Sequence, residues 1–322
     1  MRILSAYANH SEDFATSVLD AVPGAFLTCL APGDAGFAEA WAEAEVFIGW
    51  PKFGDDRPEL SPQRAAKLRW VQATSAGIAS IKGHAPEHWV ITTASGVFGP
   101  TLAEHALAMM LHFERNLHRS VVSQQQRAWG IGPASFRELA GLRLLALGFG
   151  DIGQHVAQRA VALGMRVTGL RREASEPAAG VERVVGMVDL DEALAEADVV
   201  VASLPGTRHT RGLLDARRLA LMKPDAGLVN VGRGSLIDHD ALAAQLLDRP
   251  ESYAGLDVTH PEPLPSDHPL WACPNALITP HIAGGSEKHP QRVEALFLEN
   301  LKAFAGGKPE AMRSVFDPHW EY

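Results

Sequence analysis

Gly148-Phe149-Gly150-Asp151-Ile152-Gly153 follows an apolar run at residues 142–147 and precedes a helical pattern. A strand that enters a helix through G-x-G-x-x-G leaves backbone N–H groups free at the helix start. These groups and the helix macrodipole favour the pyrophosphate of a dinucleotide. We expect Gly148 to allow the turn, Gly150 to admit the phosphates and Gly153 to let the helix pack against the strand. Glycine triplets also arise by chance in a chain with 29 glycines, but the flanking strand and helix make this one a candidate phosphate cradle.

Length and composition indicate a globular chain of two ordinary domains. The 322 residues are 46% hydrophobic, which is enough for each domain to bury a core. The net charge is −9 and no basic block is interleaved with aromatic residues, so we expect no nucleic-acid partner. The N-terminus turns polar at Asn9-His10-Ser11, and no apolar run has membrane-spanning length, so we expect no membrane association. Cys29 and Cys273 have neither disulfide-framework nor zinc-site spacing, which favours a reducing, cytoplasmic location.

Short apolar runs alternate with helical patterns along the chain. Four runs in the first part predict the strands of a small α/β domain: residues 2–6, 25–30, 46–49 and 68–73. Six later runs, most of them separated by helical segments, predict parallel βαβ units: residues 142–147, 166–170, 198–203, 227–231, 253–257 and 276–278. Long helical patterns begin at Pro100 and span residues 287–304. The nucleotide unit therefore lies in the middle of the chain, and the tail can return to the first domain.

Three further motifs each follow an expected strand: Asn230-Val231-Gly232-Arg233-Gly234, Asp257-Val258-Thr259-His260-Pro261-Glu262-Pro263-Leu264-Pro265, and Thr279-Pro280-His281-Ile282-Ala283-Gly284-Gly285. The carboxyl ends of parallel strands border the ligand crevice, so Arg233, Glu262 and His281 are expected to converge beside the nucleotide. Taken singly, these residues are typical of a solvated turn, a surface carboxylate and a structural histidine. Because all three follow the glycine motif in this order, a shared catalytic role is favoured over these separate structural roles.

With these motifs in this order, essentially the whole chain resembles the D-2-hydroxyacid dehydrogenase family, and in particular its NADP-type glyoxylate/hydroxypyruvate reductases. The resemblance implies an α/β fold of two Rossmann-like, doubly wound parallel-sheet domains. A flavodoxin-like substrate domain would comprise residues 1–97 and 287–322, and a dinucleotide-binding domain residues 98–286. It also implies reversible reduction of a 2-oxo acid to a D-2-hydroxy acid, in a homodimer that uses the helical surface around residues 101–126.

The resemblance assigns Arg233, Glu262 and His281 to catalysis. Arg233 would hold the substrate carboxylate and carbonyl oxygens with its planar charged fork. His281 would donate a proton to the carbonyl oxygen as hydride arrives from the nicotinamide, and Glu262 would orient the imidazole and favour its charged form. Asp257 resembles the residue that contacts the nicotinamide carboxamide, and Asn230 would steady the arginine loop. Further cofactor contacts are implied at Gly148, Gly150, Asp151, Ile152, Gly153, Leu204, Pro205, Thr210, Val231, Gly232, Arg233, His281, Ala283 and Gly284.

The residues after the second strand of the nucleotide unit decide the cofactor. NAD enzymes of this architecture place a carboxylate there, about 20 residues beyond the glycines, to bind the ribose 2′-hydroxyl. This chain has Arg171-Arg172 instead. Guanidinium groups can bind a 2′-phosphate with charge-assisted hydrogen bonds, so we predict a preference for NADP(H), with NAD(H) possible. The alternative is a solvated basic pair beside Glu173.

Substrate residues are harder to predict. Ser75, Ala76 and Gly77 resemble the family's loop for the substrate carboxylate, although a plain loop is the alternative. Trp50-Pro51-Lys52-Phe53 gives a pocket an apolar wall and a cation, and a tryptophan in the domain core is equally compatible with the sequence. Ala79 stands where the family commonly has a polar residue, which leaves glyoxylate, hydroxypyruvate and bulkier 2-oxo acids open. Formate oxidation is disfavoured, because formate dehydrogenases that resemble the family have glutamine in place of Glu262.

Other chemistry is disfavoured by spacing. His105 and His112 share a helix face but form no H-E-x-x-H motif, so we expect a solvated or core-edge role for both and no metal site. Ser235 lacks the G-x-S-x-G elbow of a hydrolase. The alternative from another class is a nucleotide-sensing corepressor or scaffold of the same fold, although the chain shows nothing like a peptide-docking extension.

Overall fold

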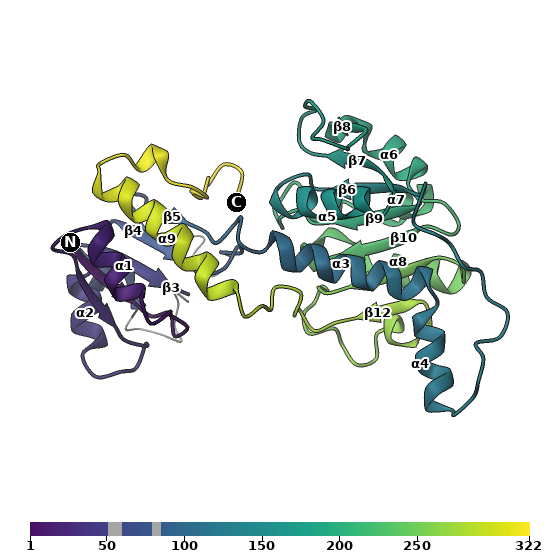
Figure 1. The fold of residues 1–322 in the computed structure, drawn as a ribbon, viewed down its shortest axis with the longest axis horizontal. Helices are drawn as coiled ribbons and strands as arrows, with labels where there is room; N and C mark the ends of the chain where they lie inside the picture. The colour runs from purple at the N-terminus through teal and green to yellow at the C-terminus, as the bar shows by residue number, and fades with distance from the viewer. Residues whose placement is uncertain (51–59, 79–84) are drawn as a thin grey trace. The chain divides into compact units, whose positions relative to one another are not determined.

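A computed structural model describes residues 1–50, 60–78 and 85–322, and the chain forms two compact units. The first unit comprises Met1–Val97 and Ser286–Tyr322, and the second comprises Phe98–Gly285. Each unit has its own parallel sheet with helices packed against it (Figure 1). Within the described ranges, every helix is too short or too polar to span a membrane.

The first unit is built on a five-stranded sheet in the order β2-β1-β3-β4-β5, the doubly wound order of flavodoxin-like folds. All neighbouring strands are parallel. The four expected strands are present, and a fifth, at the edge, was missed. The elements are β1 (Arg2–Ser5), α1 (Phe14–Ala21), β2 (Phe26–Cys29), α2 (Phe37–Glu43), β3 (Val46–Gly49), β4 (Trp70–Ala73), β5 (Val90–Thr92) and α9 (His289–Ala305).

The C-terminal helix α9 completes the core of the first unit. Its Phe297 is wholly buried and stacks on Trp70 of β4, with ring centroids 5.2 Å apart. Asn300, one turn further along, donates a hydrogen bond to the buried side chain of Gln72. At the start of the helix, Glu294 accepts hydrogen bonds from the backbone and hydroxyl of Ser11. Apolar and polar contacts together therefore hold the returning tail against the N-terminal sheet.

The second unit has a seven-stranded parallel sheet in the order β12-β11-β10-β9-β6-β7-β8. In chain order this is the Rossmann arrangement with one added edge strand, and the order reverses between β6 and β9. Both sheets agree with the predicted fold class. The elements are α3 (Gly99–Glu114), α4 (Leu117–Gln125), β6 (Arg143–Leu147), α5 (Asp151–Ala162), β7 (Arg166–Leu170), β8 (Arg183–Val185), α6 (Leu190–Glu196), β9 (Val199–Ala202), α7 (Ala216–Leu221), β10 (Gly227–Asn230), α8 (His239–Asp248), β11 (Tyr253–Leu256) and β12 (Ala276–Ile278).

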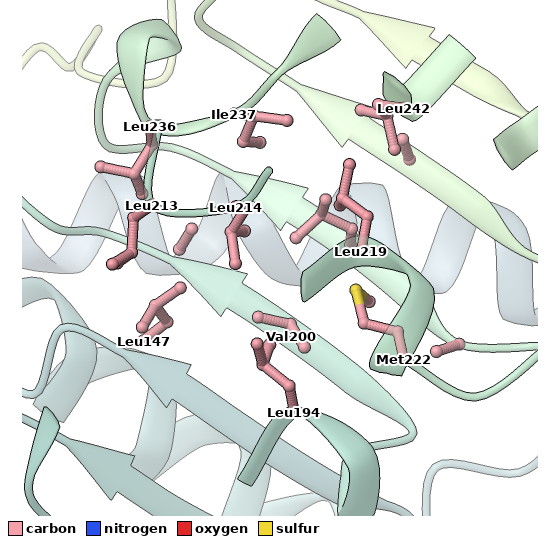
Figure 2. Packing of buried hydrophobic residues seen from close by; sticks show 14 of the residues in the cluster. Leu147, Leu194, Val200, Leu213, Leu214, Leu219, Met222, Leu236, Ile237 and Leu242 are labelled. Carbon is pink, nitrogen blue, oxygen red and sulfur yellow. The ribbon is translucent and has the colours of Figure 1, made fainter. Parts of the chain in front are cut away.

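Two hydrophobic cores cover the two faces of this sheet. Alternate residues of β6 point to opposite cores, with Leu145 and Leu147 in one and Leu144 in the other. The first core includes residues of α6, α7 and α8, and the second includes residues of α3 and α5. Figure 2 shows side chains of the first core, among them Leu147 and Val200 of the sheet. Burial on both faces fixes the strands and presents their carboxyl ends at one edge.

Candidate active site

The glycine turn lies between β6 and α5. Gly148 has φ of +106°, a left-handed conformation that L side chains rarely adopt. A Cβ on Gly153 would overlap the carbonyl oxygen of Gly148, so only glycine lets α5 start this close to the strand. Ser203 Oγ after β9 donates to the same carbonyl at 2.9 Å and fixes the turn from the next strand. The turn and the close packing expected of these glycines are thus present in the backbone.

Gly150 occupies the open side of the turn. It is the N-cap of α5, has φ of −91°, and a Cβ built on it would meet nothing within 4 Å. The helix then begins at Asp151, three residues earlier than expected, so the N–H groups of its first turn have no intrahelical partner. An open cradle at the N-terminus of a helix is suited to the pyrophosphate of a dinucleotide. These residues therefore fit the cofactor predicted from the sequence.

Substitution of Gly153 and of Gly150 by alanine should have different effects, the first on stability and the second on NADPH binding. Gly153→Ala would force α5 away from the turn and should lower the free energy of unfolding by about 1–3 kcal/mol. Gly150→Ala should leave stability unchanged and weaken NADPH binding by roughly tenfold or more, because its methyl group enters the space required by the phosphates. Urea unfolding and fluorescence titration with NADPH measure the two effects. NADPH affinity at the wild-type level in Gly150→Ala would show that the phosphates lie elsewhere.

Arg171 and Arg172 lie beside this turn. Leu170, the last residue of β7, accepts hydrogen bonds through its carbonyl oxygen from the N–H groups of Gly148 and Phe149, at 3.0 and 2.8 Å. The two arginines follow immediately, and both are exposed. Their backbone position beside the turn is therefore fixed, and both side chains reach solvent at the edge where a bound nucleotide's ribose would lie.

The arginine loop after β10 is held by its own side chains and by two glycines. Asn230, fully buried, accepts from the N–H of Gly232 at 3.0 Å and donates to the carbonyl of Arg233 at 3.0 Å. This confirms the expected role of Asn230. A Cβ on Gly232 would lie 2.8 Å from the carbonyl oxygen of Leu204, and one on Gly234 would overlap the backbone of Thr259. The N-x-G-R-G motif thus lets Arg233 pass between the loops that follow β9 and β11.

The side chain of Arg233 is half-buried, and its Nη1 donates to the carbonyl of Gly232 at 2.7 Å. Burial lowers the pKa of its guanidinium from the ordinary value, and the negative charge of Glu262 opposes this effect. Because the ordinary pKa of arginine is so high, the guanidinium stays charged. A partly desolvated, oriented cation is suited to a carboxylate ligand.

Glu262 and His281 form a direct pair. The distance between His281 Nδ1 and Glu262 Oε1 is 2.6 Å, and their side chains are 50% and 43% exposed. Nδ1 is thus directed at the carboxylate, which leaves Nε2 as the ring nitrogen able to exchange a proton with a ligand. His281 and Glu262 are therefore in contact, and Glu262 is close enough to Arg233 for its charge to raise the pKa of the guanidinium. This is the convergence at strand ends that the sequence predicts.

Asp257, at the end of β11, organises the loop that carries His281. Its Oδ1 accepts from Thr279 Oγ1 at 2.6 Å and from the N–H of Ile282 at 2.9 Å, and its Oδ2 accepts from the N–H of Ala283 at 3.0 Å. His105 of α3 contacts Thr279 Oγ1 through Nε2 at 3.0 Å. Oδ2 accepts a single hydrogen bond from the described residues, so the contact with the nicotinamide carboxamide stays a prediction.

Sequence reasoning missed how His105 and Thr279 contribute to this loop. His105 is 22% exposed and lies at the core edge, as expected, but it also holds a hydrogen bond to Thr279. Its partner is 174 residues further along the chain, so spacing gives no indication of the contact. The role of Ser203 under the glycine turn was missed for the same reason.

The other predicted cofactor residues lie in loops at the same ends of the strands. Thr210 Oγ1 donates to the carbonyl of Pro205 at 2.6 Å and accepts from the N–H of Thr207, which closes the loop after Leu204. Val231 is buried, and its N–H bonds to the carbonyl of Ala202 of β9. Ala283 is buried, and a Cβ on Gly284 would contact the ring of Phe98 at 3.3 Å. Their contacts with the dinucleotide stay predictions.

The predicted substrate residues of the first unit follow β3 and β4. Trp50 is 43% exposed, so the alternative that it belongs to the domain core is wrong. Ser75 Oγ donates to the carbonyl of Gly77 at 2.7 Å, and the Ser75 carbonyl accepts from the N–H of Ala94, which orders the loop around Ala76. Lys52 and Ala79 lie outside the described residues. A contact of these groups with substrate stays a prediction.

Residues 107–283 match the family model described as D-isomer specific 2-hydroxyacid dehydrogenase, NAD binding domain. The chain belongs to this family. It is an NAD(P)-dependent oxidoreductase of 2-hydroxy acids. Glyoxylate/hydroxypyruvate reductase B of Pectobacterium atrosepticum is 34% identical over 252 residues, which cover 76% of this chain and 78% of that protein. The chain also matches D-3-phosphoglycerate dehydrogenases, but it spans only 47% of the length of the Mycobacterium tuberculosis protein.

Solved structures of family members have the same fold. A D-isomer specific 2-hydroxyacid dehydrogenase family protein from Aeromonas salmonicida is 33% identical, with a TM-score of 0.82 over 98% of this chain and 99% of that one. A D-isomer specific 2-hydroxyacid dehydrogenase from Xanthobacter autotrophicus, in complex with NADPH and MES, is 27% identical, with a TM-score of 0.81 over 100% of this chain and 99% of that one. Family membership therefore extends over both units of the dehydrogenase.

Proposed function

We propose that this dehydrogenase reduces a small 2-oxo acid to the D-2-hydroxy acid with NADPH, in a reversible reaction. The observation that best supports this proposal is the 2.6 Å contact between His281 Nδ1 and Glu262 Oε1, close to the charged Arg233. Unit Phe98–Gly285 would bind the dinucleotide, and the unit formed by Met1–Val97 and Ser286–Tyr322 would contribute Trp50 and the Ser75-Ala76-Gly77 loop to substrate binding.

Arg233 and His281 would act on opposite parts of the substrate. The Arg233 fork binds the carboxylate and orients the adjacent carbonyl, which converts binding energy into alignment of the reacting carbon. His281 donates the proton on Nε2 to the carbonyl oxygen, and Glu262 stabilises the charged imidazole through Nδ1. In the reverse direction the neutral Nε2 accepts the hydroxyl proton.

The dinucleotide would lie over the glycine turn. Gly150 and the N–H groups of Asp151, Ile152 and Gly153 would hold its pyrophosphate, and Asp257 would receive the carboxamide. When bound, the reduced nicotinamide supplies the hydride that becomes the hydrogen on carbon 2. Leu204, Pro205, Thr210, Val231, Gly232, Ala283 and Gly284 line the loops on either side.

The two exposed arginines beside the turn support NADP(H) as the preferred cofactor, with NAD(H) possible. Arg171 and Arg172 follow β7 directly, where a carboxylate would repel a 2′-phosphate, and Glu173 comes only after them. The Xanthobacter autotrophicus structure, a complex with NADPH, belongs to the same family. The guanidinium pair is the observation in this chain that supports the same preference.

An assay with a panel of 2-oxo acids, each with NADPH and with NADH, tests the proposed function. Glyoxylate and hydroxypyruvate are the first substrates to try, because the reductase of Pectobacterium atrosepticum is named for them. We expect oxidation of NADPH with at least one small 2-oxo acid. Intact NADPH binding without turnover of any acid would favour the nucleotide-sensing corepressor or scaffold.

Substitution of Arg171 and Arg172 by alanine should weaken the use of NADPH and leave the use of NADH nearly unchanged. Arg171→Ala with Arg172→Ala should lower kcat/KM for NADPH by roughly 10- to 100-fold, since charge-assisted hydrogen bonds are lost, and should change kcat/KM for NADH little. Arg166→Ala, at the opposite end of β7, is the matched control. An equal loss with both cofactors, or a wild-type preference for NADH, would contradict this assignment.

A homodimer is the assembly we propose. Exposed apolar side chains gather on α4 and the segment after it: Leu117, Val121, Val122, Trp129 and Phe136. Their exposure to solvent is unfavourable unless a second surface covers them. Leu117, Val121 and Val122 lie within the helical surface predicted for contact, residues 101–126, and Trp129 and Phe136 follow it in the chain. Light scattering should give twice the mass of one chain, and a single-chain mass would contradict this proposal. The cytoplasmic location stays a prediction, testable by cell fractionation.

A further inference from the structure

A hydrogen-bond chain connects helix α3 to the loop that carries His281. His105 Nε2 lies 3.0 Å from Thr279 Oγ1, and Thr279 Oγ1 lies 2.6 Å from Asp257 Oδ1. An ionised carboxylate can only accept, so the threonine hydroxyl donates to Asp257. Its oxygen then accepts from the Nε2–H of His105. The chain therefore has one direction, from the helix through the hydroxyl to the carboxylate.

Asp257 in turn holds the backbone of residues 281–283 through hydrogen bonds. Its backbone carbonyl accepts from the N–H of His281 at 2.9 Å. Its carboxylate accepts from the N–H groups of Ile282 and Ala283 at 2.9 and 3.0 Å. The carboxylate is 2% exposed, so its orientation is set by these donors and by Thr279, with little contribution from solvent. A turn of the carboxylate would lengthen both backbone hydrogen bonds.

His281 itself needs this support. Its φ is +54°, in the left-handed region, which is unfavourable for a residue other than glycine. Such a conformation persists only where neighbouring contacts enforce it. The hydrogen bonds of residues 281–283 to Asp257 are those contacts, and the conformation determines where the imidazole ring meets Glu262.

We propose that His105 and Thr279 are positioning residues, which orient Asp257 and through it hold His281 in the geometry that donates a proton. This inference rests on the proposed role of His281 in the reduction. Neither residue contacts the reacting atoms in this scheme. Loss of either should reduce turnover more than substrate binding, because the binding fork of Arg233 lies on a different loop.

Two pairs of variants separate the hydrogen bonds from the bulk of the side chains. Thr279→Val removes the hydroxyl at nearly constant shape, and Thr279→Ser keeps it. His105→Phe removes the ring donor, and His105→Gln retains an amide donor. We expect kcat to fall about 10- to 100-fold in Thr279→Val and in His105→Phe, with KM for the 2-oxo acid changed less. Thr279→Ser and His105→Gln should stay near wild type.

Amide hydrogen exchange gives a readout that does not depend on activity. The amides of Ile282 and Ala283 should exchange faster in Thr279→Val and His105→Phe, and at wild-type rates in Thr279→Ser. Thermal unfolding identifies any variant that is globally destabilised. His105 is partly exposed, so its variants should fold even if Thr279→Val does not.

A double-variant cycle decides whether the two residues act as one unit. If they do, Thr279→Val combined with His105→Phe should lower kcat no further than Thr279→Val alone. Additive effects on kcat, or unchanged exchange at residues 282 and 283 in both single variants, would overturn the inference. A wild-type chain that reduces no 2-oxo acid would instead refute the proposed function, while the exchange comparison would still decide whether His105 and Thr279 order the loop.

Discussion

Arg233→Lys is expected to lower kcat/KM for the preferred 2-oxo acid by about 100-fold or more while the chain stays folded. Lysine keeps the positive charge but loses the planar fork that can bind a carboxylate through two parallel hydrogen bonds. The arginine is also oriented by its own loop, because Nη1 donates to the Gly232 carbonyl. An ammonium on a flexible stem would bind the acid in several orientations, so fewer complexes align the carbonyl carbon.

A matched control separates this effect from loss of charge or stability. Arg166→Lys, at the amino end of β7, keeps an exposed ion-pair site with Glu182 and should leave kcat/KM unchanged. Addition of guanidinium to Arg233→Ala should restore part of the activity, because the missing fork is supplied from solution. NADPH affinity measured by fluorescence should fall much less than kcat/KM in Arg233→Lys. Near-wild-type kcat/KM in that variant would show that the substrate carboxylate is bound elsewhere.

The fold was predictable from the sequence wherever a strand is buried on both faces. β9 is a continuous apolar run between helical segments, and its position follows directly from that pattern. The missed strands, β5 and β8, have three residues each and lie at the edges of their sheets. An edge strand pairs on one side only and needs no long apolar run, so periodicity indicates it less consistently: the edge strands β2 and β12 were predicted, and β5 and β8 were not.

The site was predictable where a short motif holds both the functional residue and the reason for its placement. In N-x-G-R-G the two glycines and Asn230 hold Arg233 within five residues. The link from His105 to Thr279 was not predictable, because it depends on how α3 packs beside the loop after β12. The packing of Gly234 against the backbone of Thr259 is likewise a tertiary contact. Sequence patterns thus located the residues proposed for the reaction, and the fold shows what holds them.

His281→Gln is expected to lower kcat for reduction by roughly 100- to 10,000-fold, the range for loss of a positioned general acid. Glutamine can still donate a hydrogen bond to a carbonyl oxygen, but it cannot transfer the proton. NADPH affinity should fall much less than kcat, because the glycine turn proposed to hold the pyrophosphate belongs to a different loop. Stopped-flow measurement of the first turnover would show whether the chemical step itself has slowed. A wild-type rate for that step would exclude His281 as the proton donor.

Glu262→Gln should lower kcat/KM for reduction and for oxidation without abolishing either. The carboxylate lies 2.6 Å from Nδ1 of His281, whereas an amide oxygen accepts the hydrogen bond without the charge. Proton transfer in either direction passes through the charged ring, so both rates should fall, by roughly tenfold at most for a half-exposed pair. Glu192→Gln, exposed on α6, is the matched control. Wild-type kcat/KM in both directions would contradict this role of Glu262.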